Sequence, residues 1–215
     1  IARVVHEAAD AVLLVDSVTG IAGAPVETDG WEIDFILTGS QKALALPPGL
    51  AFGVAQPRIL DRAKAAGARG IYFDLLEFEH YIKLDQTPNT PAVSLLYALD
   101  VQLARIEQET IEARWARHTE MARRTAEWVR EMRSGGIALE ILAPEGFRSP
   151  TVTCITLPPG VGTGREIAAA MESRGYTIAS GYGKLRDSTI RIGHMGDHTV
   201  AELDALLDVL AGVLG

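Results

Sequence analysis

The stretch AVLLVDSV, residues 11–18, and the stretch GSQKAL, residues 39–44, decide how this chain folds and what chemistry it can carry. The first is an apolar run that ends in an acid, Asp16, which predicts a buried strand that delivers this side chain to the carboxyl edge of a parallel sheet. The second carries Lys42, the only charged residue between positions 35 and 57. We therefore expect Lys42 to be partly desolvated, which favours the neutral amine.

An acid at a strand end and a lysine in an uncharged loop are what a pyridoxal phosphate site needs. The amine must be neutral enough to form an imine with the cofactor, and the acid must meet the pyridinium nitrogen so that the ring can accept electrons. The residues alone leave two simpler interpretations open. Lys42 can be a solvated lysine, and Asp16 can be an acid that only closes a turn.

Three stretches carry a family resemblance. They are VDSVTGIAGAPVETDGWEIDFILTGSQKALALPPGLAFGVA at residues 15–55, TPNTPAVSLLYAL at residues 87–99 and IRIGHMG at residues 190–196. Together they resemble the class V aminotransferases of pyridoxal phosphate fold type I, in particular the alanine/serine–glyoxylate aminotransferase group. The resemblance extends over nearly the whole chain.

The resemblance assigns roles to five residues of this sequence. It implies that Lys42 bonds covalently to pyridoxal 5'-phosphate and that Asp16 pairs with the ring nitrogen. It implies that Gln41 contacts the cofactor phosphate and that Thr90 reaches the phosphate of a neighbouring subunit. By the same resemblance, Arg191 would bind the α-carboxylate of the substrate.

The expected fold is α/β, as the C-terminal part of a fold type I transferase. The chain begins inside an apparent helix that is followed at once by a core strand, so we expect an upstream segment with a glycine-rich phosphate loop and an aromatic residue that stacks on the ring. By analogy with that fold, residues 1–112 would be the later portion of a large cofactor-binding domain. Residues 113–215 would form a small C-terminal domain.

The pattern along the chain predicts alternating strands and helices. Residues 92–133 lack glycine and proline and predict either one very long helix or two abutting helices. The segment DLLEFEHYIKLDQTPNTP, residues 74–91, fits neither period. The other expected strands are 11–16, 35–38, 50–55, 151–157 and 189–193, and the other expected helices are 58–66, 164–174 and 199–213.

Composition excludes several classes of protein. The formal net charge of −8 at pH 7, without a compensating basic cluster, argues against nucleic acid as a partner. No apolar run approaches the roughly 18 residues of a membrane span. A single cysteine, Cys154, excludes an internal disulfide framework and is compatible with a reducing compartment, so we expect a cytoplasmic protein.

Two competing motifs are weaker. PPGVGTGREIAAAM, residues 158–171, places a glycine-rich turn between a strand and a helix, but it lacks the spacing of a dinucleotide-binding loop and is expected to be a surface turn. His194 and His198 are four residues apart, yet a glycine lies between them and no third ligand is evident, so we expect no metal. His194 is expected to orient the loop beside Arg191, and Thr199 or a neighbouring acid to cap the last helix.

Arg191 has two possible partners. It lies between isoleucines on an expected strand, and a guanidinium in such a place needs an acceptor, for which a bidentate carboxylate is well suited. That carboxylate can belong to a substrate or to a structural acid of the chain.

The resemblance implies a pyridoxal phosphate-dependent aminotransferase that moves an amino group from a small amino acid, such as alanine or serine, to glyoxylate or pyruvate. It also implies a homodimer with shared active sites. One alternative is a lyase or desulfurase of the same fold. Desulfurases usually have a histidine where Gln41 stands and a reactive cysteine on a mobile loop, whereas Cys154 lies in an expected strand. The other alternative is a non-catalytic fragment or interaction subunit.

Overall fold

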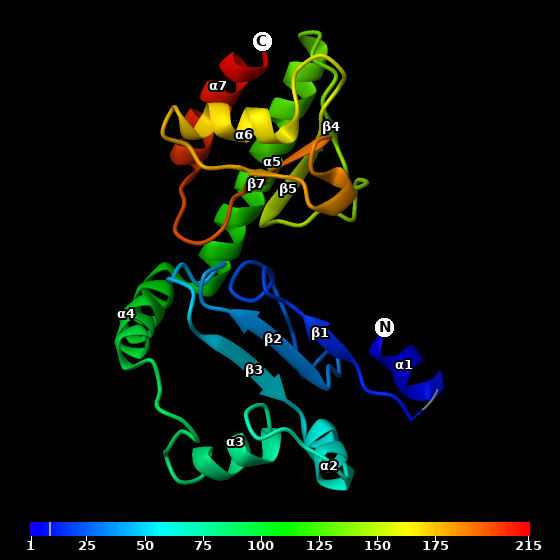
Figure 1. The fold of residues 1–215 in the computed structure, drawn as a ribbon, viewed down its shortest axis with the longest axis vertical. Coiled ribbons are helices and arrows are strands. Elements are labelled where there is room, and N and C mark those ends of the chain that lie inside the picture. The colour runs from blue at the N-terminus through cyan, green and yellow to red at the C-terminus, as the bar shows by residue number, and fades with distance from the viewer. Residues whose placement is uncertain (9) are drawn as a thin grey trace. The chain divides into compact units, whose positions relative to one another are not determined.

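The computed structural model describes residues 1–8 and 10–215, which form two compact units (Figure 1). Unit 1 comprises Ile1–Ile21 and Pro25–Arg105, and unit 2 comprises Ala22–Ala24 and Ile106–Gly215. Each unit contains a sheet and helices, so the predicted α/β class is confirmed. In the described part of the chain, no helix has the length and apolarity of a membrane span.

Unit 1 is built on a three-stranded sheet in the order β1-β2-β3. Strand β1 (Leu14–Asp16) runs parallel to β2 (Phe35–Gly39), and Asp16 pairs with Leu37. Strand β3 (Ala51–Ala55) runs antiparallel to β2. The helices of this part of the chain are α1 (Ala2–Ala8), α2 (Pro57–Ala65), α3 (Leu75–Ile82) and α4 (Val93–Glu109).

Helix α3 lies in the segment whose apolar pattern fits neither period. Its N-cap is Asp74, whose side chain accepts a hydrogen bond from Leu76 N at 3.0 Å and is paired with Arg69 Nε at 2.7 Å. An acid at this position satisfies backbone donors of the first turn and interacts favourably with the helix dipole. The cap therefore explains a helix that periodicity alone does not indicate.

The long helical region of residues 92–133 is two abutting helices, α4 and α5 (Ile111–Ser134). Thr110 separates them with a φ of 70°, a left-handed conformation that is unfavourable for a β-branched residue. Its side chain compensates by accepting a hydrogen bond from Ala113 N at 3.2 Å as the N-cap of α5. Helix α5 ends at Ser134, one residue after the predicted helical region and immediately before two glycines.

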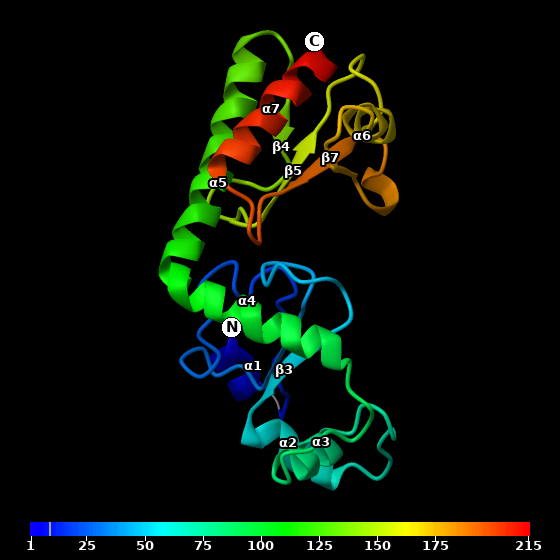
Figure 2. The ribbon, with the colours of Figure 1, turned by 90° about the vertical axis from the view of Figure 1, so that its left-hand side faces the viewer.

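Unit 2 contains a four-stranded antiparallel sheet in the order β4-β5-β7-β6. The strands are β4 (Glu140–Ile141), β5 (Val152–Thr156), β6 (Ala179–Ser180) and β7 (Thr189–Gly193). Helices α6 (Gly164–Glu172) and α7 (Val200–Leu214) complete the unit, and Figure 2 shows α7 lying along α5. The core between sheet and helices includes Met121, Ile155, Met171, Ile190 and Leu210, all fully buried.

Both short helices of unit 2 begin with a capping box. Thr163 and Glu166 exchange hydrogen bonds at the start of α6, and Thr199 and Glu202 do the same at the start of α7. Each pair satisfies two backbone donors that would otherwise be free. The glycine-rich turn before α6 is therefore closed by its own side chains, as expected for a surface turn, and the predicted cap at Thr199 is confirmed.

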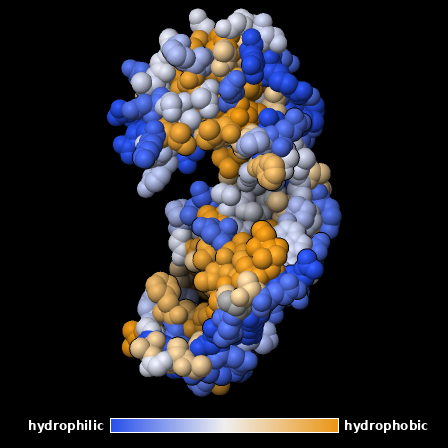
Figure 3. All heavy atoms as spheres, turned by 90° about the vertical axis from the view of Figure 1, so that its right-hand side faces the viewer, coloured by the Kyte–Doolittle hydropathy of each residue, from blue (hydrophilic) through white to orange (hydrophobic). Residues whose placement is uncertain are grey.

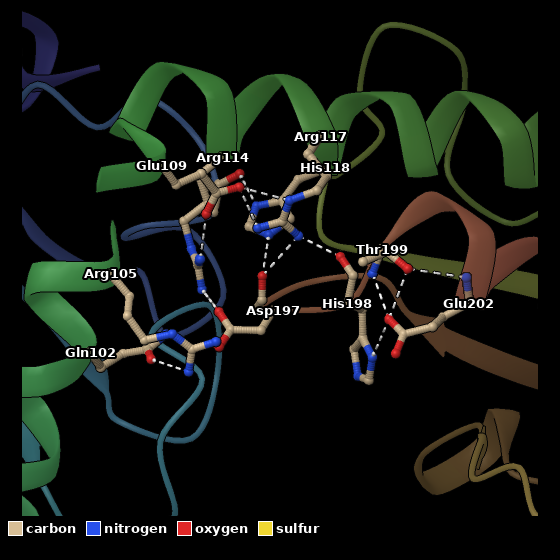
Figure 4. Close-up of polar contacts among 12 residues, drawn as sticks. Gln102, Arg105, Glu109, Arg114, Arg117, His118, Asp197, His198, Thr199 and Glu202 are labelled. Atoms are coloured by element: carbon tan, nitrogen blue, oxygen red, sulfur yellow. Dashed lines mark hydrogen bonds and ion pairs between the residues drawn. The ribbon is translucent and has the colours of Figure 1, made fainter. Parts of the chain in front are cut away.

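The first turns of α5 hold the loop before α7 through a buried arginine (Figure 4). Arg114 is only 1% exposed and donates to Glu109 Oε2 and to Asp197 Oδ1, each at 2.8 Å. Arg117 donates from Nε to Glu109 Oε1 at 2.8 Å and from a terminal nitrogen to Gly196 O at 3.0 Å. The charges of this network are thus paired and hydrogen-bonded, as a buried guanidinium requires.

Residue His118 lies one turn further along α5 and is fully buried. Its Nδ1 is 3.1 Å from Gly23 O and its Nε2 is 3.2 Å from Gly196 O. Burial lowers the pKa of His118 and outweighs the opposing effect of the two carbonyls. Because the neutral ring carries one N–H, it donates to only one of these acceptors at a time.

Asp34 joins the start of β2 to the segments around it. Its Oδ2 accepts hydrogen bonds from Leu13 N at 2.6 Å and from His6 Nε2 at 2.8 Å, and its backbone carbonyl accepts from Gln56 N at 2.9 Å. Burial opposes ionisation, but these donors, with the charge of Arg58, outweigh it and hold the pKa of Asp34 below its ordinary value of 3.8. The ionised carboxylate therefore stabilises the fold of unit 1.

We predict that Asp34→Asn lowers the free energy of unfolding at pH 7 by about 1–3 kcal/mol, because a charged acceptor of buried donors is lost. Since the folded pKa is depressed, this stabilisation is fully present above the unfolded-state pKa of about 3.8 and is lost as pH falls through the folded value. Urea unfolding of the full-length protein at several pH values measures the difference.

The matched control is Asp61→Asn, which removes an exposed carboxylate paired with the exposed Lys64 and should change the free energy of unfolding much less than Asp34→Asn. If Asp34→Asn lowered the free energy of unfolding by the same amount at pH 3 and at pH 7, the loss would come from packing rather than from charge.

Candidate active site

Asp16 and Lys42 lie at the same edge of the unit 1 sheet. Asp16 is the last residue of β1, and Lys42 follows Gly39, the last residue of β2, by three positions. Because β1 and β2 are parallel, their carboxyl ends meet at one edge of the sheet. The arrangement therefore brings a carboxylate and a primary amine to neighbouring strand ends.

Asp16 is exposed and is held by the turn that follows it. Its Oδ1 accepts a hydrogen bond from Val18 N at 3.0 Å. The parallel pairing continues past the strand end, because Ser17 N donates to Leu37 O at 3.0 Å and Thr38 Oγ1 donates to Val18 O at 3.2 Å. Asp16 thus closes a turn with one carboxylate oxygen, while its second oxygen makes no hydrogen bond to the described residues.

Lys42 is half-buried in a loop that is fixed on both sides. The next two residues, Ala43 and Leu44, are buried, and Lys42 O accepts a hydrogen bond from Ala45 N at 2.9 Å. Ala45 has a φ of 57°, so the chain turns sharply after the lysine. These contacts hold the backbone of Lys42 beside the end of β2.

Gln41 and Thr90, the two residues assigned to the cofactor phosphate, are both exposed in unit 1. The Gln41 side chain folds back over Gly39, the last residue of β2. Its Oε1 is so close that a Cβ added at Gly39 would lie 2.7 Å from it. Thr90 follows a turn in which Thr87 Oγ1 donates to Asn89 O at 2.8 Å. Both side chains are therefore accessible to a ligand or to another chain.

Arg191 belongs to unit 2, in the middle of β7, and its side chain is exposed. It pairs with Cys154 of β5 on one side and with Ala179 of β6 on the other. Its Nε donates to Ser180 O at 2.9 Å, which fixes the plane of the guanidinium. Among the residues that the structure describes, no carboxylate lies within salt-bridge distance of Arg191.

His194 ties the end of β7 to β5. It is 1% exposed, its Nε2 is 2.8 Å from Thr153 Oγ1 and its Nδ1 is 3.0 Å from Pro150 O. Burial is the main cause that lowers the pKa of His194 to about 4, so the ring is neutral and both nitrogens have partners. These contacts join the residue after β7 to the start of β5, and the orienting role beside Arg191 stays a prediction. Within residues 1–8 and 10–215, no group of His, Cys, Asp or Glu is arranged to hold a metal ion.

Sequence reasoning missed Ser40 and Asp34, which support the ends of β2. Asp34 had a visible signal, since it is an acid between the apolar residues Ile33 and Phe35. Ser40 had none, because a serine next to Gln41 resembles any polar loop residue. Its importance is apparent only from the hydrogen bonds of the folded loop.

The fold of this chain is similar to that of solved aminotransferase structures. The chain superimposes on the ureidoglycine–glyoxylate aminotransferase from Bacillus subtilis with a TM-score of 0.85 and 31% identity, over 95% of this chain and 53% of that one. The fold is that of the fold type I transferases to which this solved structure belongs. The predicted fold type is confirmed.

The chain belongs to the class V aminotransferase family, whose model, described as "Aminotransferase class-V", matches residues 1–206. It is 34% identical to the serine–glyoxylate aminotransferase of Arabidopsis thaliana over 209 residues, which cover 97% of this chain and 50% of that relative. It is 36% identical over 189 residues to an uncharacterised aminotransferase of Methanocaldococcus jannaschii, covering 87% and 48%. The predicted family is confirmed, and the chain spans about half the length of these relatives.

Proposed function

We propose that this chain is part of a pyridoxal phosphate-dependent aminotransferase that moves an amino group from a small amino acid, such as alanine or serine, to glyoxylate or pyruvate. The observation that carries the proposal is the parallel pair β1 and β2, which brings Asp16 and Lys42 to one sheet edge in a class V family member. The relatives named for serine–glyoxylate and ureidoglycine–glyoxylate transfer support the substrate class.

The chemistry of the donors fits pyridoxal phosphate. An accessible carboxylate suits the protonated ring nitrogen, and a half-buried lysine among uncharged neighbours suits covalent attachment. When bound, the cofactor supplies a sink for the electrons released at the substrate Cα. Asp16 keeps a proton at the ring nitrogen, and the Lys42 amine removes and returns the proton at Cα.

Three further residues bind and orient the cofactor or the substrate. Gln41 donates to the cofactor phosphate from its position over Gly39, and Thr90 serves the phosphate of a neighbouring subunit. Arg191 binds the α-carboxylate of the substrate through its two terminal nitrogens, because Nε is already used by Ser180 O. In this proposal residues 1–112 are the later portion of the cofactor-binding domain and residues 113–215 are the small domain, whereas the compact units of the structure divide between Arg105 and Ile106. The predicted cytoplasmic location remains a prediction.

A homodimer is part of the proposal, because Thr90 acts across subunits in it. Unit 1 exposes large apolar side chains, and Figure 3 shows one area where they gather. On α4 they recur at helical spacing, at Val93, Leu96, Tyr97 and Val101. Sedimentation of the full-length protein should give a dimer, whereas a monomer with full activity would contradict the shared site.

We predict that borohydride fixes the cofactor on Lys42 of the full-length protein, as read by peptide mass spectrometry. Lys42→Arg keeps the charge but cannot form the imine, so turnover should fall by about a thousandfold or more. Lys64→Arg is the matched control, since Lys64 is exposed and paired with Asp61 at 2.9 Å. Cofactor recovered on Lys64 or Lys83 would refute the assignment.

For Arg191, we predict that Arg191→Lys raises KM for α-amino acids by about tenfold or more, because the planar fork that binds a carboxylate is lost. Cys154 provides a second readout, since it is the only cysteine and pairs with Arg191 across the sheet. Bound alanine should slow alkylation of Cys154 in the unaltered protein and not in the variant.

Arg174→Lys, at an exposed arginine of unit 2, is the control and should behave like the unaltered protein. If amines without a carboxylate lost as much affinity as amino acids, Arg191 would be structural.

A half-reaction, in which the protein receives an amino donor but no acceptor, distinguishes an aminotransferase from a lyase or desulfurase. An aminotransferase given only the amino donor should release one 2-oxo acid per active site and then stop until an acceptor is added. Continued turnover without an acceptor would favour a lyase or desulfurase.

A further inference from the structure

The loop that carries Lys42 is closed by one buried side chain, that of Ser40. This residue is 0% exposed. Its Oγ donates to Pro47 O at 2.8 Å and accepts from Leu50 N at 3.2 Å. A single hydroxyl therefore bonds to two points on the returning half of the loop.

The backbone of Ser40 adds two more hydrogen bonds. Its N–H donates to Leu50 O at 3.0 Å, and its carbonyl accepts from Leu46 N at 3.0 Å. The segment between Ser40 and Leu50 is thus tied to Ser40 at four hydrogen bonds. Leu50 immediately precedes β3, so the same contacts connect the end of β2 to the start of β3.

Lys42 lies inside this closed loop, two residues after Ser40 and directly before the buried Ala43. The hydrogen bonds of Ser40 before Lys42 and the burial of Ala43 after it restrain the backbone on both sides of the lysine. The direction in which its side chain leaves the sheet edge therefore depends on Ser40.

We propose that Ser40 is a positioning residue that holds the Lys42 amine in the place where it bonds to the cofactor. This rests on the proposed function, because it takes Lys42 as the residue of covalent attachment. Ser40 itself touches neither cofactor nor substrate in this account. Loss of its hydroxyl leaves Leu50 N and Pro47 O without their partner, so the loop relaxes and the amine spends less time in position.

The test measures two quantities in the full-length protein. The first is the fraction of bound pyridoxal phosphate that borohydride fixes on Lys42, which reports positioning separately from affinity. The second is hydrogen exchange of residues 43–50 in the cofactor-free protein. The variants are Ser40→Ala and Ser40→Cys, the latter keeping nearly the same volume with weaker hydrogen bonds. Thr125→Ala is the control, because it removes another fully buried hydroxyl that donates to a carbonyl, in unit 2.

We expect the fixed fraction to fall by about tenfold in Ser40→Ala and by less in Ser40→Cys, with faster exchange in residues 43–50 and no change in Thr125→Ala. An unchanged fixed fraction in either Ser40 variant despite faster exchange would overturn the proposal and leave Ser40 as a loop-closing residue only. If Ser40→Ala does not fold, the fraction of cofactor fixed on Lys42 in Ser40→Cys decides between the two outcomes. Fixation on another lysine in the unaltered protein would refute the proposed function instead.

Discussion

The parallel pairing of β1 with β2 is the interaction on which the site depends. Asp16 pairs with Leu37, and Ser17 N extends the ladder to Leu37 O one residue beyond the strand. A shift of one residue would turn Asp16 to the opposite face of the sheet. The register of three paired residues therefore determines whether acid and lysine serve the same site.

Polar residues at both ends of β2 protect this register. Asp34, at the start, accepts a backbone hydrogen bond from Leu13, which directly precedes β1. Ser40, at the end, ties the Lys42 loop to the start of β3. Both side chains are buried, so each would be costly to leave unpaired, and this cost opposes slippage of the strands.

The sequence predicts the elements that have a strong local signal. The charge-free segment around Lys42 and the glycine-free region from 92 to 133 each correspond to an observed loop or pair of helices. The apolar run before Asp16 forms strand β1, but its predicted burial is wrong for the described chain, because Leu14 and Asp16 are exposed. Helix caps also depend on residues close together in the sequence, which is why Thr199 could be predicted as the cap of the last helix. Strands β4 and β6 have two residues each and exist only through pairing, so no periodicity reveals them.

Long-range polar contacts were not predictable from the sequence. Arg114 meets Asp197 across 83 positions of sequence, and in isolation each resembles a solvated charge. The site residues Lys42, Asp16, Gln41, Thr90 and Arg191 were identified by family resemblance, and their roles rest on the proposals above. What the structure adds is the sheet edge that unites Asp16 and Lys42, and the supporting residues around it.

The most direct test of the central claim is the protonation state of the cofactor ring nitrogen in the full-length protein, measured by ¹⁵N NMR with labelled pyridoxal phosphate. If the sheet edge brings Asp16 to that nitrogen, it will be protonated at pH 7 in the unaltered protein and unprotonated in Asp16→Asn. The same nitrogen shift in both proteins would contradict the account, because the carboxylate at the end of β1 would then not meet the group that Lys42 holds.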